Sequence, residues 1–171
     1  IEGCTGSLGQ GLSYANGMAL AARIQGLDYR VYCLVGDGET QEGQVWEAAM
    51  TASRQCLGNL TAILDRNGLK AMDQTSCGKS MEPIGDRWAA FGWQVREIDG
   101  HDMAQICDAL DWAETNEHAP SLIVARTVKG KGIPFMEGRP QYHNAALTEA
   151  EFAAAVAELE AQLKTVEEHH G

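Results

Sequence analysis

Two short stretches decide the fold of this chain. They read Leu34-Val35-Gly36-Asp37-Gly38-Glu39 and Ile63-Leu64-Asp65-Arg66-Asn67-Gly68-Leu69. Each begins at the end of an apolar run typical of a buried strand, 31–35 and 60–64, and continues into a polar turn. The segment between them, 41–57, has the apolar spacing of a helix. Strand, helix and strand in this order predict parallel neighbours whose carboxyl ends share one edge of a sheet, where open α/β sheets bind ligands.

Oxygen-bearing groups follow both predicted strands. Asp37 offers a carboxylate oxygen, Asn67 an amide oxygen and Leu69 a backbone carbonyl, which are hard ligands suited to Mg²⁺ or Ca²⁺. Because Mg²⁺ usually completes its octahedron with substrate phosphates and water, so sparse a protein set predicts a ligand that carries a diphosphate. The flanking Gly36 and Gly38 would let the backbone approach that diphosphate closely.

The wider set of motifs resembles one family. A Gly-Asp-Gly sequence after a strand is also ordinary turn chemistry, but with Asn67 at this spacing it is similar to the signature of thiamine diphosphate enzymes. Seven motifs between residues 2 and 147 occur in the order found in the diphosphate-binding half of transketolases: Thr5-Gly6-Ser7-Leu8-Gly9-Gln10-Gly11, Glu42-Gly43, Trp46-Glu47-Ala48, Asp65-Arg66-Asn67-Gly68-Leu69, Phe91-Gly92-Trp93, Asp99-Gly100-His101-Asp102 and Thr127-Val128-Lys129-Gly130-Lys131-Gly132. The chain most resembles the N-terminal subunit of split transketolases.

The resemblance implies a cofactor, a metal ion and a role for particular residues. Thiamine diphosphate would be bound with Mg²⁺ or Ca²⁺, and the metal ligands would be Asp37, Asn67 and the carbonyl of Leu69. The residues that line the cofactor would be Gly6, Ser7, Leu8, Gly36, Asp37, Gly38 and Asn67. Glu42 and Glu47 would belong to a chain of carboxylates at the subunit interface, and His143 would contact the ketose.

Some of these roles have simpler alternatives in the sequence itself. Glu42 and Glu47 lie near the start of a predicted helix, where a carboxylate is also a favourable partner for the helix dipole. His143 matches the family, but Asn144 stands where split transketolases commonly have Gly. His101 is interpreted as part of a turn before a helix that Asp102 caps, rather than as a catalytic group.

The implied reaction is the transfer of a two-carbon ketol unit from a ketose to an aldose, with the cofactor supplying the chemistry. The family's activating glutamate and pyrimidine pocket belong to its second half. A C-terminal transketolase subunit is therefore the expected partner, in a dimer of heterodimers that acts on a sugar or sugar phosphate. Two alternatives stay open: the α-subunit of a 2-oxo acid dehydrogenase, and a degenerate subunit that only binds a partner.

Bulk properties narrow the class of protein. The chain has 171 residues, enough for one domain, and a net charge of −11, which opposes binding to nucleic acids and anionic membranes. No apolar run approaches the ~20 residues of a membrane span. Five scattered cysteines without a Cys-x-x-Cys pair argue against zinc or disulfides and fit a cytoplasmic protein. Because the chain opens at Ile1, directly before a glycine-rich motif, we expect a fragment of a longer polypeptide.

The element order predicts a doubly wound α/β domain with a mostly parallel sheet, truncated at its N-terminus. Strands are expected near 30–36, 60–65, 93–98 and 121–128, with helices between them, and an irregular loop over 70–82. We assign 1–147 to the diphosphate-binding domain and 148–171 to a C-terminal helix of the same domain. Thr148 and Glu151 have the spacing of a capping box at the start of that helix.

Overall fold

The computed structural model describes residues 1–70, 73–74 and 82–170. Its elements in chain order are α1 (Gln10–Gln25), β1 (Val31–Gly36), the 3-10 turn η1 (Glu39–Gln41), α2 (Gly43–Arg54), β2 (Leu60–Arg66), β3 (Leu69–Lys70), β4 (Asp73–Gln74), α3 (Ile84–Ala90), β5 (Gln94–Asp99), α4 (Met103–Glu114), β6 (Ser121–Arg126), the 3-10 turn η2 (Pro140–His143) and α5 (Glu149–His170). All four predicted strands are present within two residues of their expected bounds.

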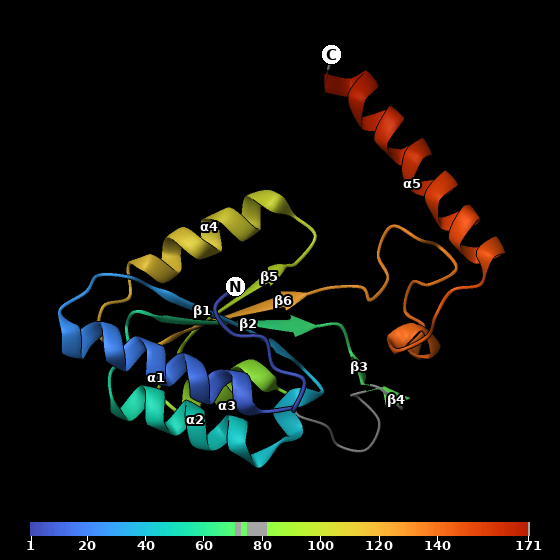
Figure 1. Ribbon diagram of the computed structural model, residues 1–171. Coiled ribbons are helices and arrows are strands. Elements are labelled where there is room, and N and C mark those ends of the chain that lie inside the picture. The colour runs from blue at the N-terminus through green and yellow to red at the C-terminus, as the bar shows by residue number, and fades with distance from the viewer. Residues whose placement is uncertain (71–72, 75–81, 171) are drawn as a thin grey trace.

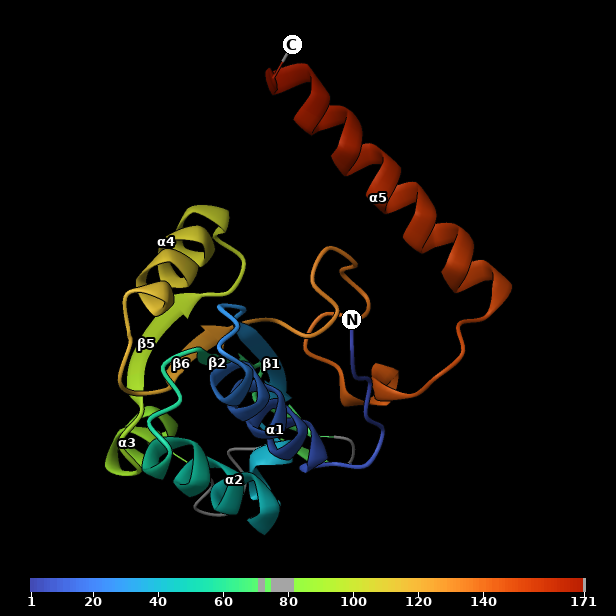
Figure 2. The ribbon, with the colours of Figure 1, turned by 60° about the vertical axis from the view of Figure 1, so that its left-hand side comes forward.

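The main sheet has the strand order β1-β2-β6-β5, and every neighbouring pair is parallel. Helices α1, α2 and α3 cover one face, while α4 covers the other (Figure 1). Figure 2 shows the same two layers from the side. The doubly wound α/β class predicted from the sequence is therefore confirmed. Because the strands are parallel, all of them deliver their carboxyl ends to one edge of the sheet.

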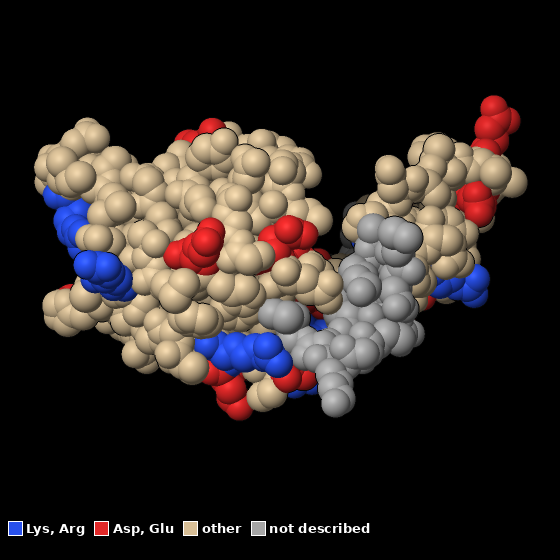
Figure 3. Space-filling model, turned by 90° about the horizontal axis from the view of Figure 1, so that it is seen from below, with Lys and Arg blue, Asp and Glu red and all other residues tan. Residues whose placement is uncertain are grey.

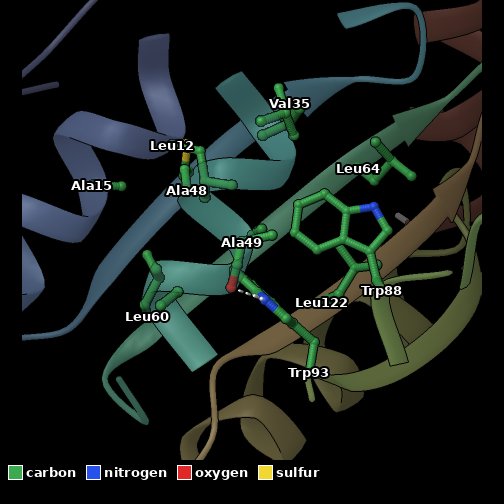
Figure 4. Close-up of a cluster of buried hydrophobic side chains, with 14 of the residues drawn as sticks. Leu12, Ala15, Val35, Ala48, Ala49, Leu60, Leu64, Trp88, Trp93 and Leu122 are labelled. Atoms are coloured by element: carbon green, nitrogen blue, oxygen red, sulfur yellow. Dashed lines mark hydrogen bonds between the residues drawn. The ribbon is translucent and has the colours of Figure 1, made fainter. Parts of the chain in front are cut away.

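The larger core lies between the sheet and α1, α2 and α3. Small side chains at helical spacing in α1 and α2, including Ala15 and Ala48, let the two helices approach each other closely (Figure 4). Trp88 of α3 is fully buried in this core, with its ring 4.7 Å from the ring of Trp93 and nearly perpendicular to it. The indole N–H of Trp93 donates to the Ala49 carbonyl at 3.0 Å, which ties the start of β5 to α2.

β1 is buried on one face only, which differs from the continuous burial that its apolar sequence predicts. Val31, Cys33 and Val35 point into the core, whereas Tyr32 and Leu34 are 46% and 73% exposed. The reason is the topology: β1 lies at the edge of the sheet, three positions from β5, and α4 packs over β5 and β6. The opposite face of β1 therefore carries apolar side chains that the described residues do not cover.

Two helices begin at the capping residues that the sequence predicts. The Asp102 carboxylate accepts hydrogen bonds from the backbone N–H groups of Ala104 and Gln105, at 2.9 and 3.2 Å, and so caps α4. At α5, the Glu151 carboxylate accepts from the Thr148 N–H at 2.9 Å, and the Thr148 hydroxyl accepts from the Glu151 N–H at 3.3 Å. This reciprocal pair is the predicted capping box.

The expected loop over 70–82 is partly wrong. β3 and β4 pair antiparallel, with Leu69 opposite Gln74 and Lys70 opposite Asp73. Residues 71–72 and 75–81 of that prediction lie outside the described residues. The polar composition of the segment hid the short hairpin, since two-residue strands leave too few positions for an alternating pattern.

α5 extends away from the layered body in both ribbon views (Figures 1 and 2). Seen from below, it forms with the preceding segment a lobe beside the body (Figure 3). On the described part of that face, acidic and basic side chains lie in small groups among uncharged ones (Figure 3). None of the helices in the described ranges combines the length and the apolar composition that crossing a bilayer requires.

Candidate cofactor site at the carboxyl edge of the sheet

The carboxyl ends of β1, β2 and β6 meet as the sequence predicts. Gly36 is opposite Asp65 in the β1–β2 pair, and Arg66 is opposite Arg126 in the β2–β6 pair. The Asp37 N–H donates to the Asp65 carbonyl at 3.2 Å, so the ladder continues one step beyond the end of β1. The two quoted motifs therefore lie side by side at this edge.

Asp37 is the central charged group of the edge, and only 3% of its surface is exposed. Its carboxylate accepts from the Gly38 N–H and the Gly68 N–H, each at 2.7 Å, and lies 3.0 Å from the Arg66 guanidinium. Burial raises the pKa of the Asp37 carboxyl, while the two N–H groups and Arg66 act in the opposite direction. The chain thus keeps a buried carboxylate at the strand ends and places a positive group against it.

Asn67 is held by its own neighbours. Its side-chain oxygen accepts from the Leu69 N–H at 2.9 Å, and its side-chain nitrogen donates to the Asp65 carboxylate at 2.9 Å. The second oxygen of Asp65 accepts from the Thr127 hydroxyl, just after β6. Asp65 and Thr127, which were not among the predicted site residues, therefore fix the orientation of the Asn67 amide.

Glu39 is a third residue that sequence reasoning missed. One of its carboxylate oxygens accepts from the Gly9 N–H at 2.8 Å, and the other accepts from the Gly36 N–H at 3.1 Å. Gln44 adds a bond to the Gly9 carbonyl at 3.2 Å. Glu39 therefore ties the glycine-rich loop before α1 to the end of β1. The signal was its position directly after Gly36-Asp37-Gly38, where a carboxylate reaches the turn's own backbone.

The remaining predicted cofactor contacts, Gly6, Ser7 and Leu8, lie in the exposed loop that Glu39 anchors through Gly9. An apolar cavity of about 220 Å³ borders the same edge on the α4 side of the sheet. Asp65 and Thr127 line it together with Leu34, Ile63, Ile98, Gly100, Ile106, Leu110, Ile123 and Ala125. The edge is thus flanked by a glycine-rich loop and an apolar recess.

We expect Glu39→Ala to lower the free energy of unfolding by about 1–2 kcal/mol, because two backbone N–H groups lose their acceptor in a half-buried place. Amide hydrogen exchange at Gly9 and Gly36 should become faster in the same variant. Glu117→Ala, which removes an exposed carboxylate from the far end of the sheet, is the charge-matched control. Equal exchange at both glycines in the two variants would contradict the tethering role.

The three predicted catalytic residues, Glu42, Glu47 and His143, are exposed, in contrast to the buried Asp37. Glu42 immediately precedes α2 and Glu47 lies within it, and both are exposed, so a partner could reach them. The Glu42 side chain makes no capping bond to α2. His143 is exposed at the end of η2 and lines a shallow hollow with Pro140, Gln141 and Asn144. Because η2 packs against β3, His143 lies on the side of the molecule where Leu69 begins the hairpin.

The oxygen ligands predicted at this edge suit a hard metal ion such as Mg²⁺ or Ca²⁺. Asp37, Asn67 and the Leu69 carbonyl supply one carboxylate, one amide and one backbone oxygen. Such a set suits Mg²⁺ together with the oxygens of a phosphate ligand. The described part of the chain contains no cluster of three or more His, Cys, Asp or Glu side chains that could hold a metal ion. In this structure the Arg66 guanidinium lies 3.0 Å from the Asp37 carboxylate, so this carboxylate faces a positive charge.

Sequence comparisons identify the family of this chain. A family model described as the thiamine diphosphate binding domain of transketolase matches residues 1–165. A 6-deoxy-6-sulfo-D-fructose transketolase subunit from Clostridium sp. (strain MSTE9) is 47% identical over 160 residues, which cover 94% of this chain and 58% of the relative. One subunit of an apulose-4-phosphate transketolase from Phocaeicola vulgatus is 40% identical, over 99% of this chain and 60% of the relative. The chain thus spans less than two-thirds of these curated relatives.

A structural comparison gives the same result. The crystal structure of a transketolase from Campylobacter jejuni superposes with a TM-score of 0.85 at 34% identity. The match covers 91% of this chain and 26% of that one. The fold of this chain is therefore that of one part of the Campylobacter jejuni transketolase.

Proposed function

Because this chain belongs to the transketolase family, as its thiamine diphosphate-binding domain, we propose that it forms the diphosphate- and Mg²⁺-binding part of a transketolase. The enzyme would transfer a two-carbon ketol unit from a ketose to an aldose acceptor. The observation that carries the proposal is Asp37, a buried carboxylate held between the ends of β1 and β2 beside Asn67 and Leu69.

In this proposal, the chain's own residues bind the metal ion and orient its ligands. Asp37, the Asn67 amide oxygen and the Leu69 carbonyl would hold Mg²⁺. The Asn67 side-chain nitrogen donates to the Asp65 carboxylate, which keeps the amide oxygen facing away from Asp65. The metal ion would replace Arg66 as the positive group that offsets the burial of Asp37. Thiamine diphosphate supplies the carbanion chemistry on which ketol transfer depends.

The glycine-rich loop forms the other wall of the site. Gly6, Ser7 and Leu8 border the cofactor, together with Gly36 and Gly38, and the Glu39 tether through Gly9 holds the loop close to the metal ligands. His143 contacts the ketose.

A partner subunit completes the proposed enzyme. Glu42 and Glu47, exposed on the α2 side, join a chain of carboxylates at its interface, and the partner covers the pyrimidine ring of the cofactor. Two relatives are named as subunits, which supports a partner for this chain. We propose a dimer of heterodimers in the cytoplasm, acting on a sugar or sugar phosphate. The similarity to transketolases favours this function over a 2-oxo acid dehydrogenase subunit.

The test is a reconstitution with the C-terminal transketolase subunit, Mg²⁺ and thiamine diphosphate. The assembled enzyme is expected to consume a ketose only when an aldose acceptor is present, because ketol transfer needs an acceptor for the two-carbon unit. It should release no CO₂ from pyruvate or other 2-oxo acids. Steady CO₂ release without acceptor-dependent ketose consumption would replace the proposal by the dehydrogenase alternative. Binding of the partner without either reaction would favour a degenerate subunit.

A further inference from the structure

α5 carries an apolar stripe whose side chains stay largely exposed among the described residues. The stripe consists of Phe152, Val156, Leu159, Leu163 and Val166. These residues follow one another at intervals of four, three, four and three, the spacing that keeps side chains on one side of a helix. All five are exposed, Phe152 by 62% and Leu163 by 58%, whereas Ala155 alone is buried among the described α5 side chains. A soluble helix normally buries such a stripe.

Contacts of Glu151 and Gln162 fix the direction in which the stripe faces. The Tyr142 hydroxyl donates to the Glu151 carboxylate at 3.0 Å, and the Gln162 side chain donates to the Gly132 carbonyl at 2.9 Å. Leu159 lies over Gly132. The helix is therefore attached to the 129–143 segment along one side, and the stripe lies next to that attached side. The rest of α5 stands clear of the body in both ribbon views (Figures 1 and 2).

Charge indicates what could cover the stripe. Between residues 149 and 168 the chain has six Glu and one Lys. At 100° per residue, Glu149 and Glu160 border the stripe on the side away from the 129–143 segment, and both are exposed. A second copy of α5 would bring like charges together, and the stripe is shorter than the three to four heptads typical of a stable coiled coil. A basic partner surface would instead be attracted.

Resting on the proposed function, we propose that the α5 stripe is a docking surface for the partner subunit. The partner would receive it in an apolar groove bordered by Lys or Arg side chains, in the manner of a helix laid in a groove. Val156 and Leu163, near the middle of the stripe, would enter the groove. Glu160 at its border would face the basic rim.

The experiment measures the dissociation constant between this protein and its C-terminal partner subunit by sedimentation velocity, at low and at high NaCl. The double variant Val156→Gln/Leu163→Gln is expected to weaken assembly by at least about tenfold, since it removes apolar contacts but keeps good helix formers. The matched control Ala154→Gln/Ala161→Gln changes exposed positions on the opposite face and should leave assembly unchanged. Glu160→Gln should reduce the salt dependence of assembly more than Glu168→Gln does.

Each contrary outcome overturns the proposal and points to a different explanation. Equal effects of the two double variants would show that the stripe takes no part in assembly. Self-association of the protein without its partner, lost only in the stripe variant, would identify a second copy as the occupant. A lower melting temperature of the stripe variant alone would show that the protein covers its own stripe. Failure of the unchanged protein to bind the partner would instead refute the partner assignment in the proposed function.

Discussion

Replacing Asp37 by Asn is expected to weaken Mg²⁺-dependent binding of thiamine diphosphate to the assembled enzyme by on the order of 100-fold or more. Asp37 is the only charged member of the proposed ligand set, so the variant leaves the metal ion with neutral oxygens alone. The amide also places a donor nitrogen where the carboxylate now accepts from Gly68 and Arg66. Isothermal titration calorimetry with and without Mg²⁺ measures the effect directly.

The control for this prediction is Asp108→Asn, which removes the same charge from an exposed position on α4. It should leave cofactor affinity unchanged. Circular dichroism should confirm that the Asp37 variant is folded, because loss of a backbone-bonded carboxylate costs stability as well as affinity. An affinity equal to that of the unchanged enzyme, in a folded Asp37 variant, would remove the metal assignment.

The second large effect is expected in the core. Trp88→Ala should lower the free energy of unfolding by about 3–5 kcal/mol, because a fully buried indole leaves a cavity between α3 and the sheet. The ring contacts with Trp46 and Trp93, at 5.4 and 4.7 Å between centroids, would be lost at the same time. Urea denaturation followed by circular dichroism measures the change. An unchanged slope of the free energy of unfolding against urea concentration would show that unfolding exposes the same amount of surface in both proteins.

Trp88→Phe provides the matched comparison. The indole N–H of Trp88 has no hydrogen-bond partner among the described residues, so replacing the ring by benzene removes no bond seen there. Phe keeps most of the packing, and we expect a cost below about 1.5 kcal/mol. Equal costs for the two variants would contradict the assignment of the effect to the lost volume of the ring.

The sequence predicted the parts of this structure that depend on strong local patterns. Four apolar runs separated by helical spacing were enough to predict the parallel sheet, and the turn chemistry after Val35 and Leu64 placed Asp37 and Asn67 at one edge. The capping residues Asp102 and Thr148 also act as predicted, because a cap is a contact between residues only three apart.

Contacts between distant segments could not be predicted in this way. Glu39 reaches Gly9 across thirty positions, and Thr127 reaches Asp65 across sixty-two, so neither contact leaves a periodic signal. The exposure of Leu34 depends on which strand lies at the edge of the sheet, and strand order is a property of the whole fold. The functions of Glu42, Glu47 and His143 depend on a partner and a substrate, and they stay predictions.

The strand order also sets a sequence of events during synthesis. β5 pairs only with β6 in the described sheet, and β2 reaches its second neighbour only when β6 is present. Since β6 is the last of the four strands to be made, a nascent chain that ends before Ser121 can pair β1 with β2 but leaves β5 without a neighbour. An unpaired strand is a site for wrong association. The ribosome-bound chain is therefore most exposed to aggregation between the emergence of β5 and that of β6.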